Sequence, residues 1–147
     1  MDAATSAPAT ATTSLACMNR IPIPVAVAAG GVLGALARYG VTVAWPVDPG
    51  TFGWATWAVN VSGCFLIGVL MVLISARCPG QRLIRPFFGV GILGGYTTFS
   101  TSVADVQQTA AAGAPGVALL YLGATVVAAL LAVWAGTALT TALVRPR

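Results

Sequence analysis

The sequence predicts an all-α membrane protein with four transmembrane helices, the third of them broken. Of its 147 residues, 58% are hydrophobic and 7% are charged, and the mean hydropathy is +0.91. A soluble domain usually carries about 25% charged residues. Apolar runs of about 20 residues, the length that crosses a bilayer as a helix, recur along the chain. One of these runs contains a dense polar and glycine-rich segment, which predicts the break.

The apolar runs define one membrane domain, residues 22–144. The expected spans are residues 22–46, 52–76, 86–112 and 116–144. Residues 1–21 are rich in Ala, Thr and Ser without apolar periodicity, which indicates a disordered tail. They lack the basic segment followed by an apolar segment that is typical of a signal peptide. Residues 145–147 form a short basic C-terminus.

The placement of arginine predicts a single orientation in the plasma membrane. The net charge of +4 comes from seven Arg and three Asp, with no Lys, Glu or His. The loops of one side of the membrane have no Lys or Arg. The other side has six arginines, namely Arg20, Arg77, Arg82, Arg85, Arg145 and Arg147. By the positive-inside rule, both termini are cytoplasmic. No clustered basic surface remains for nucleic acid.

The residue types do not support an enzyme. Without His or Glu, and with scattered Asp, no nucleophile has a base nearby. Cys17, Cys64 and Cys78 are too far apart for a metal site or a disulfide framework. A small proton-coupled drug exporter would need a carboxylate in the membrane, for which Asp105 is the sole candidate. A non-conducting structural four-helix protein is a further alternative, but it leaves the polar segment unexplained.

The first span carries a close-packing motif and a charge. Gly30 and Gly34 form a GxxxG pair, which permits close approach of another helix. Arg38 lies eight residues before Pro46, so about 12 Å inside the helix end. An intramembrane Arg usually faces a cavity or a partner, where it would provide an anion vestibule. Alternatively, its long stem carries the guanidinium to the interface.

The second span contains one strongly polar residue, Asn60. An Asn in hydrocarbon must hydrogen-bond something. One interpretation is a bond to another helix, worth about 0.6 kcal/mol on average. The other is an amide donor that lines a pore. The sequence leaves both open.

The third span contains Gly91–Ser102, which reads GILGGYTTFSTS. It combines three glycines with five hydroxyl residues, namely Thr97, Thr98, Ser100, Thr101 and Ser102. Because a helical glycine costs about 1 kcal/mol relative to alanine, we expect the helix to break near Gly94–Thr97. Protein or ions must then satisfy the freed backbone. Hydroxyls, amides and helix ends can replace the water around an anion, and carbonyl oxygens can hold Na⁺.

Phe99 lies between two hydroxyl residues of this segment. A phenyl ring has a positive edge that can face an anion. Its alternative role is packing against lipid or the protein core.

The three motif regions resemble the Fluc (CrcB) fluoride channels. The resemblance rests on GGVLGALARYG in the first span, GTFGWATWAVNVSGCFLIG in the second and GVGILGGYTTFSTS in the third. It covers residues 22–144, although the fourth span contributes little. It implies passive, selective efflux of F⁻ through antiparallel dimers with two pores. It also implies a structural Na⁺, not transported, held where the broken helices meet.

The resemblance assigns residues by motif. Those implied for the fluoride pathway are Asn60, Arg38, Phe99, Ser100 and Thr101, with Tyr121 and Thr125 from a looser match on the fourth span. The backbone carbonyls of Gly94 and Thr97 match the Na⁺ ligands.

One residue departs from the family pattern. Ser102 stands where the family has the second phenylalanine of its pore pair, so a pore that needs this ring would be altered or inactive. An antiparallel homodimer also needs a chain that inserts both ways, whereas the arginines here are strongly one-sided. Both observations favour a heterodimer with a related subunit of opposite orientation that supplies the complete phenylalanine pair.

Overall fold

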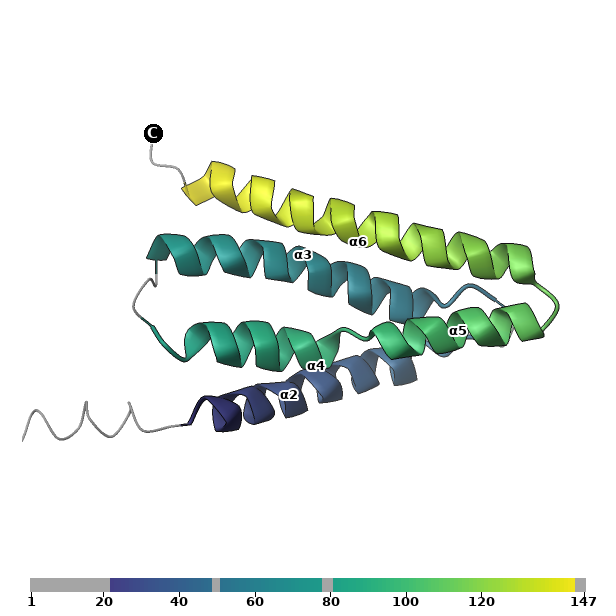
Figure 1. The fold of residues 1–147 in the computed structure, drawn as a ribbon, viewed down its shortest axis with the longest axis horizontal. Coiled ribbons are helices and arrows are strands. Elements are labelled where there is room, and N and C mark those ends of the chain that lie inside the picture. Colours follow the sequence, from purple (N-terminus) through teal and green to yellow (C-terminus); the bar gives the residue numbers. More distant parts are fainter. Residues whose placement is uncertain (1–21, 49–50, 78–80, 145–147) are drawn as a thin grey trace, which may run out of the picture.

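The computed structural model describes residues 22–48, 51–77 and 81–144, and these residues contain helices but no strand. Figure 1 shows their arrangement. The elements are α2 (Ile23–Ala44), α3 (Trp54–Arg77), η1 (Arg85–Leu93), α4 (Gly94–Tyr96), α5 (Phe99–Ala111) and α6 (Pro115–Val144). The expected tail, residues 1–21, and the basic C-terminus, residues 145–147, lie outside the described residues.

The all-helical fold is confirmed. Three of the helices, α2, α3 and α6, are long and apolar enough to cross a membrane, with 22, 24 and 30 residues. The remaining expected span is divided into η1, α4 and α5 in succession. The start of α2, the end of α3 and the end of α6 lie at the same end of the molecule (Figure 1). The antiparallel dimer stays a prediction, because the structure contains one chain.

Glycines bring α2 into backbone contact with η1 and α4. A Cβ atom on Gly34 would collide with the carbonyl oxygen of Ile92, and one on Gly95 would collide with that of Gly31. The close approach expected from Gly30 and Gly34 is therefore confirmed. Without a hydrophobic driving force between helices in lipid, such close van der Waals packing is a main source of association.

A second glycine contact joins α3 to α6. A Cβ atom on Gly68 would lie 2.6 Å from the carbonyl oxygen of Val133, and one on Gly136 would collide with that of Phe65. The segment α5 also packs against α6. The broken span thus changes partner along its length: η1 and α4 lie along α2, and α5 lies along α6.

The first part of the broken span is wound as a π-helix, Arg85–Leu93, which the sequence did not predict. Pro86 lies in its first turn, where the missing N–H is tolerated. Most π-helices are single turns inside α-helices and are often found at functional sites.

The helix breaks at Thr97 and Thr98, at the C-terminal edge of the expected stretch. Their backbone angles are extended, with φ −78° and ψ 156° at Thr97 and φ −149° and ψ 123° at Thr98. Gly94 and Gly95 are helical instead, and Gly95 packs so closely against Gly31 that it leaves no room for a side chain. The break falls on two β-branched residues, which favour extended backbone.

Replacement of Gly34 by Ala tests the packing of α2. Because the new Cβ must displace the backbone of η1, we expect a loss of about 1–3 kcal/mol in stability. The measurement is the midpoint of thermal unfolding in detergent, followed by loss of the monodisperse peak in gel filtration. Gly40→Ala is the matched control, since a Cβ on Gly40 of the same helix meets no atom within 4 Å. Equal midpoints for the two variants would contradict the packing.

Candidate functional site at the helix break

The side-chain amide of Asn60 pairs with the backbone of Thr98. Its Nδ2 donates to the Thr98 carbonyl oxygen at 2.9 Å, and the Thr98 N–H donates to its Oδ1 at 2.8 Å. Nδ2 also donates to Oγ of Ser102 at 2.8 Å. Asn60 is 8% exposed; its bond to Ser102 is buried, and its two bonds to Thr98 are partly buried. The interhelical hydrogen bond, one of the two interpretations of Asn60, is therefore present.

Thr98 also begins the next helix. Its Oγ1 accepts the N–H of Thr101 at 3.2 Å, as an N-cap of α5, and lies 2.9 Å from the hydroxyl oxygen of Thr101. Ser102 donates to the Thr98 carbonyl at 3.2 Å, and Thr97 donates to that of Leu93 at 3.0 Å. Most hydroxyls of the segment therefore satisfy the broken backbone itself. Sequence reasoning missed this role of Thr98, although a Thr directly before a helix is a signal for a cap.

The surface of α3 is shaped to receive the break. Gly63 leaves room for the methyl group of Thr97, which a Cβ at residue 63 would overlap. The hydroxyl oxygen of Ser62 lies 3.1 Å from that of Tyr96. Asn60, Ser62 and Gly63 thus fix the chain on both sides of Thr97.

An open groove of about 320 Å³ runs from the break along α6. We call it the phenyl groove. Five of the predicted site residues line it: Asn60, Thr97, Phe99, Tyr121 and Thr125. The ring of Phe99 is 78% exposed, so it projects away from the chain and does not pack in this chain's own core.

The polar groups of α6 in this groove already have partners. Tyr121 is 1% exposed, lies edge-on to Phe52 with ring centroids 4.8 Å apart, and donates its hydroxyl hydrogen to Oδ2 of Asp105 at 3.3 Å. Thr125 donates to the carbonyl oxygen of Tyr121 within the same helix at 2.7 Å. Neither hydroxyl presents a free hydrogen to the groove.

Arg38 lies on the other side of the break. It lines a hollow of about 360 Å³ together with Thr42, Thr56, Thr98 and Thr101, which we call the arginine hollow. Arg38 thus lies beside a cavity, and its role toward an anion stays a prediction. Thr98 lines both this hollow and the phenyl groove. Ser100, the remaining predicted residue of the pathway, is exposed. Its hydroxyl oxygen lies 3.4 Å from the hydroxyl oxygen of Thr98.

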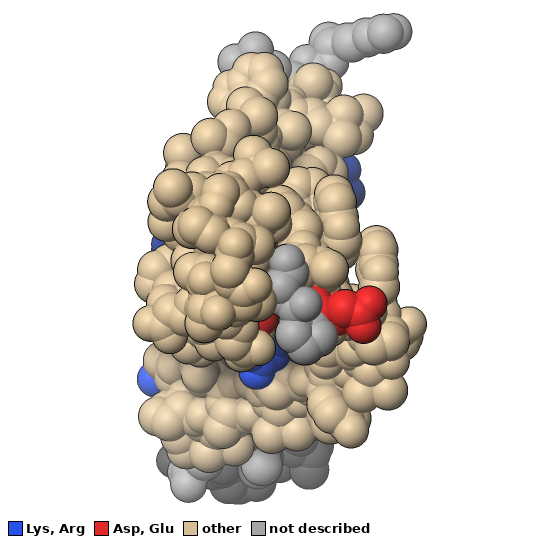
Figure 2. Space-filling view, turned by 90° about the vertical axis from the view of Figure 1, so that its right-hand side faces the viewer, with Lys and Arg blue, Asp and Glu red and all other residues tan. Residues whose placement is uncertain are grey.

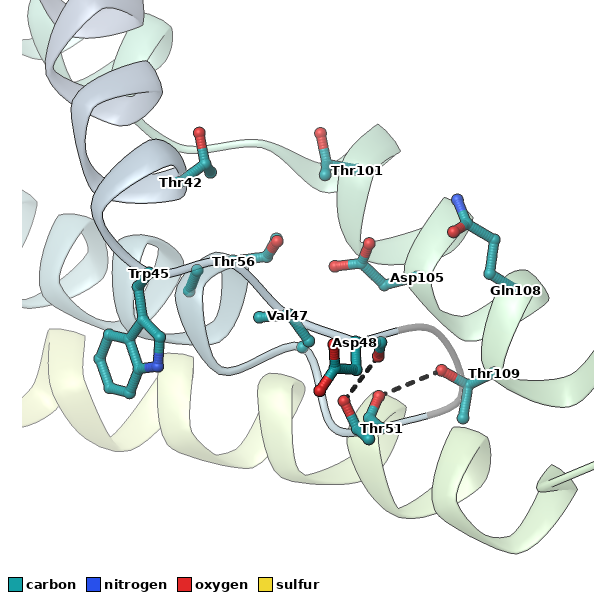
Figure 3. A pocket seen from close by; sticks show the side chains of 12 residues that line it. Thr42, Trp45, Val47, Asp48, Thr51, Thr56, Thr101, Asp105, Gln108 and Thr109 are labelled. Carbon is teal, nitrogen blue, oxygen red and sulfur yellow. Dashed lines mark hydrogen bonds between the residues drawn. The ribbon is translucent and has the colours of Figure 1, made fainter. Parts of the chain in front are cut away.

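Beyond Thr101 the surface becomes acidic. Asp48 and Asp105, the two aspartates within the described ranges, line an adjoining hollow of about 230 Å³ with Thr51 and Thr109 (Figure 3). Thr109 donates to the carbonyl of Thr51 at 3.4 Å. Figure 2 shows acidic atoms on this end of the molecule. The exposed residues Arg77, Arg82 and Arg85 belong to the opposite end, where α3 ends and η1 begins.

The break also frees backbone oxygens. In an unbroken helix the Thr98 N–H would donate to the carbonyl of Gly94, but here it donates to Asn60. Gly94 is exposed, and a Cβ there would meet no atom within 4 Å. No group of three His, Cys, Asp or Glu occurs within residues 22–48, 51–77 and 81–144. Carbonyl oxygens at the break are ligands of the kind that a hard cation binds.

The break, the groove and the two hollows lie within a recognised family region. Residues 25–137 match the family described as CrcB-like protein, Camphor Resistance (CrcB). The chain belongs to this family. The CrcB resemblance of the motifs is thus confirmed.

Named relatives align with most of the chain. A protein of Thermobifida fusca named fluoride-specific ion channel FluC 2 is 52% identical over 122 residues, which are 83% of this chain and 90% of the relative. A FluC 2 of Nocardia farcinica is 52% identical over 115 residues, 78% of this chain and 82% of the relative. A FluC 2 of Streptomyces avermitilis is 50% identical over 107 residues, 73% of this chain and 68% of the relative.

Replacement of Asn60 by Ala tests the role of the amide. The Thr98 N–H would lose its partner in a buried setting, and the Thr98 carbonyl would keep only Ser102. We expect a loss of about 1–3 kcal/mol for each group left unpaired. Thermal unfolding in detergent, followed by tryptophan fluorescence, measures it. In the control Ser75→Ala, α3 loses only a hydroxyl bond to its own Met71 carbonyl. An Asn60 variant as stable as this control would rule out the role.

Proposed function

We propose that this chain is a subunit of a fluoride-specific channel through which F⁻ leaves the cytoplasm passively. The observation that carries the proposal is the identity of about 50% to proteins named fluoride-specific ion channels, over the region that contains the break. The chain acts as a channel and not as an enzyme.

The pathway we assign follows the phenyl groove. The ring edge of Phe99 faces the ion, because its positive edge favours an anion without holding it by a full charge. Of the other residues assigned to the pathway, Asn60, Tyr121 and Thr125 line the groove, Thr101 lines the arginine hollow, and Ser100 is exposed next to Phe99. The guanidinium of Arg38, in its hollow beside Thr98, attracts anions and raises their local concentration.

The open shape of the groove supports a dimer. The ring of Phe99 is largely exposed, and none of the aromatic pairs formed by the described residues includes it. A second subunit in antiparallel orientation would close the groove and complete the pathway. Streptomyces avermitilis has relatives named FluC 2 and FluC 3, so unlike members of the family occur in one organism. Together with Ser102 and the one-sided arginines, this favours a heterodimer.

A structural Na⁺ completes the proposed assembly. The carbonyl oxygens of Gly94 and Thr97 from both subunits would surround it where the breaks meet. Gly94 is exposed, and the Thr98 N–H that would bond its carbonyl in a continuous helix donates to Asn60 instead, which fits this role. The ion stabilises the crossing of the two subunits and is not transported.

The orientation follows from the exposed arginines. Arg77, Arg82 and Arg85 lie at the end that also holds the start of α2 and the end of α6. With this end in the cytoplasm, both termini are cytoplasmic, and the hollow lined by Asp48 and Asp105 faces the outside of the cell.

The function is tested by anion efflux from liposomes that contain the full chain, alone and together with a related subunit. We expect F⁻ to pass far faster than Cl⁻ in at least one of the two arrangements. Equal permeability to both anions, or no F⁻ efflux in either arrangement, would overturn the assignment. Full F⁻ current from antiparallel dimers of this chain alone would overturn the heterodimer.

Two substitutions, Asn60→Asp and Asp105→Asn, together separate the channel from the exporter alternative. Asn60→Asp places a negative charge beside the groove, and at an effective dielectric constant of about 20 two charges 4 Å apart repel by about 4 kcal/mol. We expect F⁻ efflux to fall more than tenfold. Asp105→Asn should leave F⁻ efflux largely intact, whereas a proton-coupled exporter would lose its activity. Unchanged efflux in Asn60→Asp would show that the Asn60 side chain lies outside the anion path.

A further inference from the structure

We propose that Ser102 is a positioning residue: it limits anion passage along the phenyl groove by occupying one of the two amide hydrogens of Asn60. The inference rests on the proposed function and deepens it. In the sequence, residue 102 stood out only for the phenyl ring that is missing there. The inference assigns a role to the hydroxyl that Ser102 carries instead.

The amide of Asn60 has two hydrogens, and both are already donated within the chain. One goes to the Thr98 carbonyl at 2.9 Å and the other to Oγ of Ser102 at 2.8 Å. Both side chains are nearly buried, Asn60 at 8% and Ser102 at 5% exposure, and both line the groove. An anion in the groove therefore receives no amide hydrogen unless it displaces one of these acceptors.

The two bonds differ in what their loss would do. The bond to Thr98 is one half of a pair, since the Thr98 N–H returns to Oδ1 of the same amide at 2.8 Å. Its loss would release the broken backbone. The bond to Ser102 lies outside this pair. Without the Ser102 hydroxyl, both bonds between Asn60 and Thr98 remain, the Thr98 carbonyl loses the bond that it accepts from Ser102 at 3.2 Å, and one amide hydrogen of Asn60 becomes free beside the groove.

Few other groups of the groove can replace this hydrogen. Tyr121 donates to Asp105, and Thr125 donates to its own helix. The hydroxyl oxygen of Thr98 accepts from the α5 backbone and contacts that of Thr101. Much of the remaining lining is aliphatic, namely Val103, Val106, Leu122, Val126, Ala129 and Leu130. The second hydrogen of Asn60 is thus the donor whose availability decides how well the groove replaces the water of an anion.

The first test measures F⁻ efflux from liposomes for Ser102→Ala, alone and with the related subunit. A hydrogen bond to a charged group contributes about 1.5–3 kcal/mol, so a freed donor should raise the rate about tenfold or more. Ser102→Thr keeps the hydroxyl and should behave like the wild type. Thr140→Val is the control, because it removes another buried hydroxyl, which donates to the Gly136 carbonyl far from Asn60. An unchanged or lower rate in Ser102→Ala would overturn the inference.

The second test observes the amide directly. The sequence has two asparagines, Asn19 and Asn60, so ¹⁵N-asparagine labelling gives two side-chain NH2 groups with two hydrogen signals each, and Asn60→Gln assigns the pair of Asn60. In the wild type both Asn60 hydrogens should be protected from exchange with solvent, and in Ser102→Ala one of them should exchange. Continued protection of both would overturn the positioning role. Absence of F⁻ efflux from every sample, with the exchange result as expected, would instead overturn the proposed function and with it the effect on passage.

Discussion

The pairing of the Asn60 amide with the N–H and carbonyl of Thr98 is the contact on which this fold depends. A break in a transmembrane helix exposes backbone groups that lipid cannot satisfy. Here one side chain from α3 serves both groups of Thr98 in the way a neighbouring peptide would. Because the break is satisfied, the third span can leave α2 after α4 and continue along α6 as α5. The groove and the arginine hollow lie on the two sides of that crossing.

Glycines make this crossing possible. Gly34 and Gly95 bring two backbones together on one side, and Gly68 and Gly136 do so on the other. Gly63 receives the methyl group of Thr97 beside the break. In lipid, where apolar side chains gain little by leaving the solvent, this close contact positions the break against Asn60. The polar centre and the small-residue contacts therefore support one another.

Sequence periodicity predicted α2, α3 and α6, the three helices long and apolar enough to cross a membrane, because apolar length is a local property. It also predicted that the third span breaks, but not that Gly94 and Gly95 stay helical, since the contact of Gly95 with Gly31 joins residues 64 positions apart in the sequence. The two interpretations of Asn60 could not be separated, because an amide suits either role and its partner Thr98 is 38 residues away. The π-helical winding of η1 and the placement of Asp48 and Asp105 around one hollow were likewise not predicted from local sequence patterns.

The residues assigned from family motifs differ in exposure and in hydrogen bonding. Phe99 is free to meet an ion or a partner, whereas Tyr121 and Thr125 already donate their hydrogens within the chain. This contrast makes the Phe99 side of the groove, and not α6, the face where an anion would find interactions. It also explains why the single amide of Asn60 matters both to the fold and to the proposed pathway.

Hydrogen exchange at the backbone amide of Thr98, followed by NMR on the ¹⁵N-labelled protein in micelles, tests this account most directly. In an open break this N–H would face water, whereas here Oδ1 of Asn60 accepts it. We predict exchange as slow as in the middle of α5, and fast exchange in Asn60→Ala. Fast exchange of the Thr98 amide in the wild type, or the same slow rate in both proteins, would contradict the pairing.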